Sequence, residues 1–461
     1  MRNEAIPEAK SIAPEQLQLD LETTINLALR RNRALGDSRD AVVMAGYTLV
    51  GAESEFELKI TPAAGARISG YSGEDNYDSQ ELGMTVSKEL TIGTRGYVTP
   101  LIIRRDSGIE EYEAALDTFL VQPLLRGLSP EYNLAGVLAA EYGERTAARS
   151  LYLARVDTML KAVRNVYEII RLRDILRLNE EAAQRLEGYA AAARSKEKIG
   201  LASPIDVYRA EIQLNQALET LALTRQSYLD SIDRLKVLLT LSLETELKVT
   251  APLDYRLVRV DEAEAVRTAL FNRVEIDQAR DNISEAERRA RHARHGILPS
   301  LDLELSYRRF GENEDFGRSF RFDRESWGVG LAAEGDLWRT REKAEYQRRL
   351  LSVRMEKRDL TFLRDTVQLE VLKEARDLKK AAQTIKIQRE QIRQAEGKLE
   401  LSRIKFRHGM ADNFDLIESE RELLRAQTRL LNAVTGYIVS TYRFKAALGT
   451  LIEKPPIRRE S

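Results

Sequence analysis

The sequence of this chain repeats itself once, and that repeat limits the folds open to it. The segment 198–206 aligns without gaps on 407–415, an offset of 209 residues. The register continues downstream through further matched pairs: Glu211 and Glu420, Tyr228 and Tyr437, Lys236 and Lys445, and Leu239 and Leu448. Upstream, a second block aligns at an offset of 241, with Arg39-Asp40 on Arg280-Asp281. The chain is therefore a tandem duplication of one structural unit.

The first copy is longer than the second. Because the two offsets differ by roughly thirty residues, the first copy holds additional residues between its matched blocks. They include 83–104, a strand–Gly–strand pattern without a counterpart in the second copy. A second hairpin and an elaborated loop are both compatible with this insertion.

Each copy contains a helix far longer than an average globular helix. In the second copy, 339–408 is a stretch of 70 residues without proline, and its apolar residues recur at steps of three, four or seven. This spacing predicts a helix with a narrow apolar seam, on the order of 105 Å long at about 1.5 Å per residue. The equivalent helix in the first copy is 130–198, where Ser129 suits the N-cap and Pro130 the first helical position.

Both long helices are predicted to stop at matched glycines, Gly200 and Gly409. Glycine readily adopts the left-handed conformation that commonly ends a helix. Ser203-Pro204 and Asp412-Asn413 then restart a helix as a cap and first turn. Each copy thus ends in a tight helical hairpin. The spacing of its apolar residues alone does not distinguish a specialised structure from an ordinary antiparallel coiled coil.

Between the helices of the second copy, apolar and polar residues alternate with a period of two. The apolar positions are Leu301, Leu303, Leu305 and Tyr307, and, after a polar loop, Trp327, Val329, Leu331, Ala333 and Leu337. Such alternation is typical of a half-buried sheet and also of an outer-membrane barrel, apolar toward lipid and polar toward the lumen. Tyr307, Phe310 and Trp327 would suit the aromatic girdle of a barrel.

The first copy repeats this alternation more weakly. Its apolar positions are Ala64, Ala66 and Ile68, then Met84, Val86, Leu90 and Ile92, and Lys88 interrupts the second set. A soluble α+β sandwich could give the same alternation, but it would not explain hairpins on rods about 100 Å long. A barrel continued by a helical tube explains both.

Composition excludes several classes of protein. Lys and Arg number 72 against 73 Asp and Glu, a balance that argues against a polybasic nucleic-acid binder. The absence of cysteine excludes disulfides and Cys-ligated zinc. No apolar run reaches the roughly 18 residues of a transmembrane helix, and the N-terminus lacks the apolar core of a signal peptide. The sequence also lacks phosphate-loop and hydrolase motifs, so we expect neither an enzyme nor a cofactor or metal site.

These signals predict a mostly α fold with a small β portion. The expected layout is an N-terminal extension 1–18, a first repeat 19–242, a linker 243–260, a second repeat 261–452 and a tail 453–461. The first repeat comprises helix 19–57, strands within 59–125, helix 130–198, tip 199–204 and helix 204–242. The second comprises helix 261–296, strands 299–338, helix 339–408, tip 408–413 and helix 413–449.

These residues resemble the TolC family of outer-membrane channel-tunnel proteins, from about Leu19 to Ile452. The resemblance rests on two tip signatures, Gly200…Asp206…Ala210-Glu211 and Gly409…Asp415…Glu420, on Lys445–Gly449, and on Gln122–Gly127. It implies a homotrimer in the cell outer membrane whose strands, usually four per protomer, pool into one barrel. The helices would form a periplasmic tunnel that docks a periplasmic adaptor protein of an inner-membrane pump, as an exit duct for efflux or type I secretion.

The resemblance also implies roles for tip residues. Asp415 and Glu418 match two acidic residues that ring the periplasmic aperture, although Asp415 could instead serve the first helical turn. The adaptor-docking tips would be Gly200, Leu201, Ala202, Ser203, Asp206, Gly409, Met410, Ala411 and Asp412. Relatives close the tunnel with an arginine and a tyrosine bound to an aspartate. Here the aspartate is Asp206, but the partner positions hold Ala411 and Phe406, so we expect closure by other contacts or a looser resting state.

Two further hypotheses remain open. The arginine-rich segment 288–295 could contact anionic lipid headgroups, although a solvated helix end is the favoured interpretation. The alternative function is a soluble coiled-coil scaffold, which would stay in the soluble fraction of a cell lysate.

Overall fold

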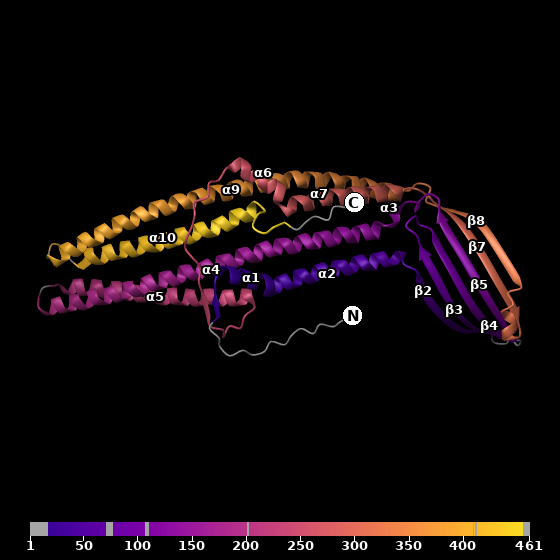
Figure 1. Cartoon of the computed structure of the whole chain (residues 1–461), viewed down its shortest axis with the longest axis horizontal. Coiled ribbons are helices and arrows are strands. Elements are labelled where there is room, and N and C mark those ends of the chain that lie inside the picture. The colour runs from indigo at the N-terminus through magenta and orange to yellow at the C-terminus, as the bar shows by residue number, and fades with distance from the viewer. Residues whose placement is uncertain are drawn as a thin grey trace. The chain divides into compact units, whose positions relative to one another are not determined.

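The computed structural model describes residues 17–70, 77–106, 110–200, 202–408, 410 and 413–454. The chain divides into two compact units (Figure 1). The first unit comprises Met1–Asp40, Arg149–Ile276 and Phe362–Ser461, and the second comprises Ala41–Ala148 and Asp277–Thr361. Among the described residues, no helix combines the length and the apolar character that crossing a membrane requires.

The duplication is visible in the bounds of the helices. Helices α1 (Leu21–Arg31) and α6 (Glu262–Asn272) begin and end at the offset of 241, each after an aspartate N-cap. Helices α5 (Pro204–Leu239) and α10 (Asn413–Ala447) begin at the offset of 209. They are followed at matched positions by left-handed residues, Thr240 with φ 56° and Gly449 with φ 69°. The same local signals therefore end the same helices twice.

The helices predicted at 19–57 and 261–296 are each broken in two, which corrects the sequence-based expectation. Helix α2 (Arg33–Glu53) follows α1 after Asn32, and α7 (Val274–His295) follows α6 after Arg273. Both intervening residues have an extended ψ, 127° and 124°. The Asn32 side chain stabilises its break, because it accepts a hydrogen bond from Leu35 N at 3.3 Å and donates one to Leu238 O at 2.9 Å.

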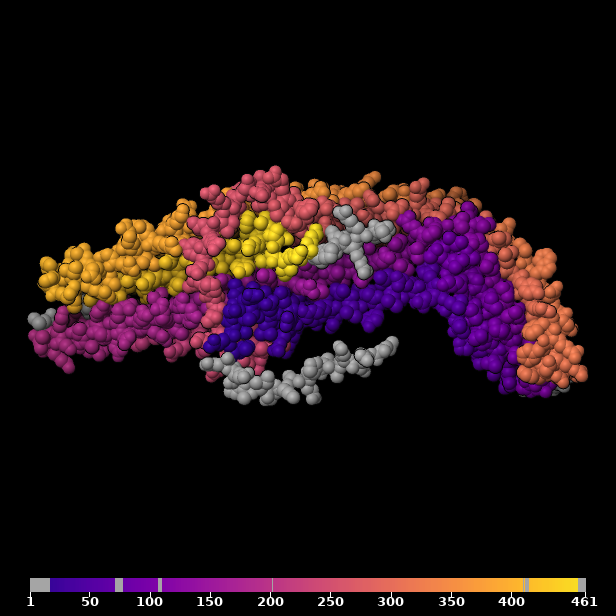
Figure 2. Space-filling view, viewed as in Figure 1, coloured from indigo at the N-terminus to yellow at the C-terminus, as the bar shows by residue number. Residues whose placement is uncertain are grey.

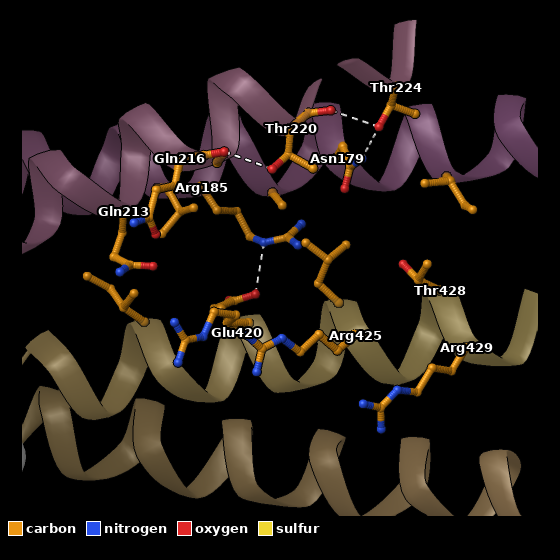
Figure 3. Close-up of a pocket in the computed structure, with 17 residues that line it drawn as sticks. Asn179, Arg185, Gln213, Gln216, Thr220, Thr224, Glu420, Arg425, Thr428 and Arg429 are labelled. Carbon is orange, nitrogen blue, oxygen red and sulfur yellow. Dashed lines mark hydrogen bonds and ion pairs between the residues drawn. The ribbon is translucent and has the colours of Figure 1, made fainter. Parts of the chain in front are cut away.

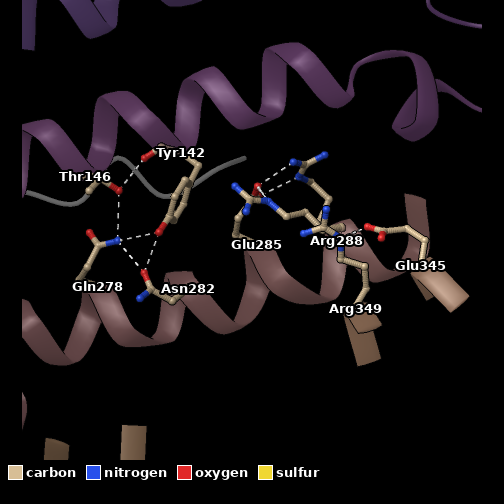
Figure 4. Close-up of polar contacts among 9 residues, drawn as sticks. Tyr142, Thr146, Gln278, Asn282, Glu285, Arg288, Glu345 and Arg349 are labelled. Atoms are coloured by element: carbon tan, nitrogen blue, oxygen red, sulfur yellow. Dashed lines mark hydrogen bonds and ion pairs between the residues drawn. The ribbon is translucent and has the colours of Figure 1, made fainter. Parts of the chain in front are cut away.

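The long helices are α4 (Ala135–Lys198) and α9 (Thr340–Arg407), of 64 and 68 residues. The first starts later than predicted, because Pro130–Asn133 forms a separate short helix, α3, and Leu134 interrupts it. In α9 the predicted seam is fully buried over its middle part, at Val367, Val371, Ala375, Leu378 and Ile385. Near the N-terminal end of α4, a hydrogen-bonded network joins this helix to α7 (Figure 4). It consists of Tyr142, Thr146, Gln278 and Asn282.

The predicted linker 243–260 is not only a linker. Its strand β6 (Leu247–Val249) pairs in parallel with β1 (Leu17–Leu19), which lies within the predicted N-terminal extension and helix. This pair packs with α1, α4 and α5 into one core, whose fully buried residues include Ala28, Ile170, Leu235 and Leu239. Burial of this apolar cluster holds the first unit together.

The second unit is built around a six-stranded antiparallel sheet of order β2-β3-β4-β5-β7-β8. The first repeat supplies β2 (Lys59–Ser69), β3 (Tyr77–Glu89), β4 (Arg95–Asp106) and β5 (Glu110–Pro123). The second repeat supplies β7 (Ser300–Asn313) and β8 (Arg324–Glu334), with the short helix α8 (Phe316–Ser319) between them. A single turn of 3-10 helix, Ser54–Phe56, precedes β2. In Figure 2 the surface of the first-repeat strands continues without a break into that of the second-repeat strands.

The insertion in the first copy is thus a second hairpin. Residues 83–104 fall within the hairpin of β3 and β4, whose turn is closed by Leu90 N donating to Thr94 O at 2.8 Å. Leu90 and Ile92 lie in this turn and not in a strand, contrary to the predicted alternation. Likewise Leu337 lies beyond the end of β8.

Directly paired residues of an antiparallel sheet share one face, so the strand register shows which side chains lie together. One face is apolar across all six strands. Its exposed large side chains, called here the apolar face, are Ile60, Ile68, Leu82, Met84, Val98, Leu116, Leu305, Tyr307, Trp327, Val329 and Leu331. Lys88 shares this face but lies near its end, where its ammonium donates to Phe56 O at 2.5 Å, so it does not interrupt the apolar positions.

The opposite face is more polar. Glu113, which is only 5% exposed, contacts Arg308 and lies 2.6 Å from Arg105 Nη2. Phe310 also belongs to this face, because it pairs with Ala115, two residues from Glu113 along β5. Its ring lies 5.3 Å from the Arg308 guanidinium. The prediction that Phe310 joins Tyr307 and Trp327 in one girdle is therefore wrong, whereas those two residues are direct partners.

Candidate functional site at the helical tips

The first tip is closed by local hydrogen bonds. Helix α4 ends at Lys198, and Gly200 follows with φ +75°, a conformation that glycine adopts without strain. Ser203 then caps α5 in a reciprocal capping box with Asp206, whose Oδ2 accepts from Ser203 N at 3.1 Å and from Ser203 Oγ at 2.8 Å. These hydrogen bonds hold the pKa of the Asp206 carboxyl below its usual value. Ala202 lies within this turn, and Leu201 lies outside the described residues.

The second tip is described in part. Helix α9 ends at Arg407, Met410 N donates to Lys405 O at 2.9 Å, and α10 begins at Asn413. Gly409, Ala411 and Asp412 lie outside the described residues. Exposed apolar side chains cluster around both tips; they are Ile199, Ile205 and Tyr208 in the first repeat and Met410 and Phe414 in the second.

The two predicted aperture carboxylates differ in their surroundings. Asp415 is exposed in the first turn of α10. Glu418 is half-buried, forms an ion pair with Arg421, and lines a groove of about 110 Å³ with Asp206, Arg209 and Phe414. Glu418 is therefore the more buried of the two carboxylates, and Asp415 is the more exposed.

Two cation–π contacts join the repeats near the tips. The Lys196 ammonium lies 4.0 Å from the centre of the Phe406 ring, and the Arg209 guanidinium lies 5.8 Å from that of Phe414. Cation–π pairs of this kind contribute about 0.5–1 kcal/mol each at exposed sites. Phe406, which lacks the tyrosine hydroxyl, thus still connects the two tips.

A buried glutamate makes the strongest connection between the repeats. Glu420 is 6% exposed and accepts hydrogen bonds from Arg185 Nε at 3.0 Å, Tyr189 Oη at 3.0 Å and Arg403 Nη2 at 2.8 Å. We call these four residues the Glu420 cluster. Burial and the neighbouring Glu420 carboxylate raise the pKa of Tyr189, so its hydroxyl stays protonated and donates. The cluster joins α4 of the first repeat to α9 and α10 of the second.

The duplication explains part of this cluster. Arg403–Glu420 is the equivalent, at the offset of 209, of the pair Arg194–Glu211, in which Arg194 Nε lies 2.7 Å from Glu211. Among the residues that the structure describes, only the second-repeat pair is also bound by residues of the other repeat, Arg185 and Tyr189. Sequence reasoning noted both glutamates in the tip signatures but not their partners, because partners from another repeat leave no spacing pattern in the sequence.

A groove of about 500 Å³ adjoins the Glu420 cluster (Figure 3). Helices α4 and α5 supply amides and hydroxyls, from Asn179, Gln213, Gln216, Thr220 and Thr224. Helix α10 contributes Arg421, Arg425 and Arg429, which are spaced four residues apart and so share one helix face. This row of arginines was not predicted from the sequence, although its four-residue spacing is visible there. Within the described residues, no group of three acidic or histidine side chains is placed to hold a metal ion.

Comparisons with known proteins connect this geometry to a family. The sequence profile of the family described as Outer membrane efflux protein matches residues 265–450. The chain is also 22% identical over 331 residues to the outer membrane protein TolC of Vibrio cholerae, an alignment that covers 68% of this chain and 73% of that protein. The matched residues include α10 and the second-repeat strands.

Solved structures share the fold. The outer membrane protein VceC of Vibrio cholerae superposes with a TM-score of 0.73 at 16% identity, over 93% of this chain and 96% of that one. The CmeC outer membrane channel of Campylobacter jejuni gives a TM-score of 0.71 at 15% identity, over 98% and 95% of the two chains. At these identities the likeness establishes the fold, which is mostly helical with tandem repeats, as predicted.

Proposed function

From this confirmed relationship to the TolC family of outer-membrane efflux channels, we propose that three copies of the chain form one channel in the outer membrane. The strands of the three copies pool into one barrel, and the helices form a tunnel that extends into the periplasm. The tunnel serves an inner-membrane pump as an exit duct, in a tripartite efflux pump or a type I secretion system.

The apolar face of the sheet is the observation that carries this proposal. Its large side chains are well exposed, with Trp327 at 77% and Leu331 at 68%, across all six strands. An apolar surface of this extent in a folded chain marks a contact with lipid or with another protein. Lipid suits it, because the other face is polar and carries Arg308, Glu113 and Asp117, as the lumen of a membrane barrel does.

The open edges of the sheet support a trimer. Within the described residues, β2 and β8 each pair with a strand on one side only. Closing a sheet on itself satisfies both edges, and three six-stranded sheets joined edge to edge would give eighteen strands. A barrel of about that size leaves an aqueous channel. One sheet of six strands would be too small to do so.

The helical tips are the proposed adaptor-docking surface. Ile199, Ile205, Tyr208, Met410 and Phe414 expose apolar area on both tips. Gly200 and the capping box of Ser203 and Asp206 fix the shape of the first tip. A periplasmic adaptor that covers these side chains would remove apolar surface from water, a favourable change.

Conductance and assembly test the proposal together. We expect the purified protein to migrate as a trimer in detergent, to pass ions across a planar lipid bilayer, and to sediment with outer membranes after carbonate extraction. The heat-denatured protein is the control for conductance. A monomer that stays in the soluble fraction and conducts nothing would contradict the proposal and support the coiled-coil scaffold instead.

Ion selectivity tests the proposed aperture. Three copies of Asp415 would form a ring of exposed carboxylates, which favours cations. We expect Asp415→Asn to shift the reversal potential in a potassium chloride gradient toward lower cation selectivity. Glu418→Gln is the matched comparison, and its effect should be smaller because Glu418 is half-buried whereas Asp415 is exposed. Unchanged selectivity in Asp415→Asn would remove this residue from the aperture.

A further inference from the structure

A basic pocket lies beside the ends of strands β5 and β7, within the second unit. It has a volume of about 460 Å³ and lies between α3, the end of α7 and the first turns of α9. Its arginines are Arg126, Arg288, Arg289, Arg341 and Arg349. The backbone places it at the sheet, because Arg126 N donates to Pro299 O at 3.3 Å just before β7 begins.

The carboxylates around the pocket are shared between arginines. Glu285 accepts hydrogen bonds from Arg288 Nε and from Arg289 Nε, each at 2.7 Å. Only 11% of the Arg288 side chain and 7% of the Glu285 side chain are exposed. Burial by itself would raise the pKa of Glu285, but the hydrogen bonds from both arginines lower it instead, so this carboxyl is ionised.

A second carboxylate is shared in the same way on α9. Glu345 lies 2.6 Å from Arg348 Nη2. It also lies 2.7 Å from Arg349 Nε (Figure 4). Glu342, which also lines the pocket, adds a third carboxylate. Five arginines therefore line the pocket with two carboxylates, Glu342 and Glu345, and Glu285 lies beside them, so an excess of positive charge remains around the pocket.

His292 also lines the pocket, and its pKa reflects this excess of positive charge. Its ring stacks on that of Tyr132, with centroids 4.3 Å apart and planes inclined by 6°. Burial lowers the pKa of His292, the positive charges of Arg288 and Arg349 lower it further, and Glu131 opposes them. A cationic imidazolium is thus disfavoured here, as expected where burial and neighbouring positive charges act together.

We propose that this pocket binds a phosphate group. Guanidinium groups are planar donors whose geometry matches phosphate oxygens, and arginine is the residue that proteins favour for such contacts. The arginines come from three separate segments, the turn after β5, α7 and α9, so they surround the pocket from several sides. The positive charge that the ion pairs with Glu285 and Glu345 leave uncompensated attracts an anion to the pocket.

The source of the phosphate is a phospholipid headgroup or free phosphate. The proposed function favours the headgroup, and this step rests on that function. If the apolar face of the sheet contacts lipid, a pocket at the helix-side ends of β5 and β7 lies near the level of the headgroups. Basic pockets at that level bind anionic lipids in other membrane proteins.

Binding can be measured on the full-length protein in detergent, without any channel activity. Inorganic phosphate and short-chain phosphatidylglycerol are titrated separately, while the His292 resonance is followed by NMR on protein labelled at histidine. The chain has only three histidines, which keeps the spectrum simple. We expect either ligand to raise the pKa of His292, because a bound anion opposes the arginine charges.

Matched variants distinguish binding in the pocket from nonspecific attraction of an anion to arginines elsewhere on the protein. The double variant Arg126→Gln with Arg341→Gln removes two pocket arginines, and Arg354→Gln with Arg358→Gln removes two exposed arginines of α9 outside it. We expect the pocket variant to weaken binding at least tenfold, since one hydrogen bond to a charged group contributes about 1.5–3 kcal/mol. The control variant should bind as the parent does.

The outcomes distinguish the two sources and the two proposals. Tighter binding of phosphatidylglycerol identifies a headgroup site, and tighter binding of inorganic phosphate identifies a free-phosphate site. Equal weakening in both double variants, or no change in the pKa of His292 with either ligand, would overturn the proposal. A protein that binds phosphate but fails to conduct would contradict only the channel function.

Discussion

At the scale of single residues, the most informative side chain is the buried carboxylate of Glu420. It receives hydrogen bonds from Arg185, Tyr189 and Arg403, and so from both repeats. A buried charge is stable only when its partners compensate the loss of water. The Glu420 cluster therefore concentrates several contacts between the repeats on one buried carboxyl group.

We expect Glu420→Gln to destabilise the protein by about 2–3 kcal/mol. This value lies below the full cost of breaking a buried ion pair, because Arg185 and Arg403 are partly exposed. Thermal unfolding in detergent measures the loss, and the resting conductance should rise as the repeats separate. The control is Glu422→Gln on the same helix, whose exposed pair with Lys398 should contribute less than about 1 kcal/mol. Equal effects of the two substitutions would argue against a special role for Glu420.

A second prediction concerns Asp206 at the first tip. Because the folded-state pKa of Asp206 is lowered, its contribution to stability is complete above the unfolded value near 3.9. That contribution is lost as the pH falls through the lower, folded value. We expect Ser203→Ala to raise the pKa of Asp206 and to cost about 1 kcal/mol of helix capping. Hydrogen exchange at the start of α5, measured from pH 6 to pH 3, would show both effects; identical exchange in parent and variant would contradict them.

At the scale of elements, the hairpin of β3 and β4 is the structure that the second copy lacks. Its turn is fixed against α3, because Asn133 Nδ2 donates to Thr91 O at 2.9 Å and to Gly127 O at 2.7 Å. Gly93 in this turn has φ +86°, and a Cβ there would overlap the Gly127 carbonyl oxygen and lie 2.8 Å from Asn133 Nδ2. Only glycine satisfies both the backbone conformation and the close approach.

We therefore expect Gly93→Ala to destabilise the hairpin by at least about 1–3 kcal/mol, the usual cost of a left-handed non-glycine residue. Gly96→Ala in β4 is the matched control, since the nearest atom to its added Cβ is Leu120 Cδ1 at 4.0 Å. Hydrogen exchange of β3 and β4 should accelerate in the first variant alone. Equal protection in both would show that the turn has room to adjust.

At the scale of the whole molecule, the two faces of the sheet differ in polarity, and the proposed location in a membrane follows from this difference. Leu331 lies on the apolar face, and its neighbour Ala332 lies on the opposite face, paired with Asp302. In a membrane barrel, an arginine facing lipid costs about 2–4 kcal/mol at the midplane, whereas lumen positions tolerate charge.

We expect Leu331→Arg to reduce insertion into lipid vesicles and the yield of trimer, and Ala332→Arg to leave both near the parent level. Flotation of the vesicles and gel migration before and after heating measure these quantities. The two substitutions add the same side chain at adjacent positions, so any difference arises from the face. If both variants insert equally well, the apolar face does not contact lipid.

The sequence alone determined the duplication and most of the helices, because these depend on local signals. Helices α1 and α6 begin within two residues of the starts predicted at 19 and 261, and α4 ends at the predicted residue, before Gly200. The resemblance to the TolC family rested on the same signals, and the family profile over residues 265–450 and the Vibrio cholerae relative support it. The aperture and docking roles of the tip residues stay predictions.

Only the tertiary structure decided which residues meet across the repeats. The helix breaks at Asn32 and Arg273, the second hairpin, the position of Phe310 and the partners of Glu420 all depend on contacts between residues far apart in the chain. Arg288 belongs to the segment 288–295, whose favoured interpretation from the sequence is a solvated helix end, yet the fold brings it into one pocket with Arg349. Periodicity records how a segment buries its own apolar side chains, but it holds no information about which distant charge lies opposite.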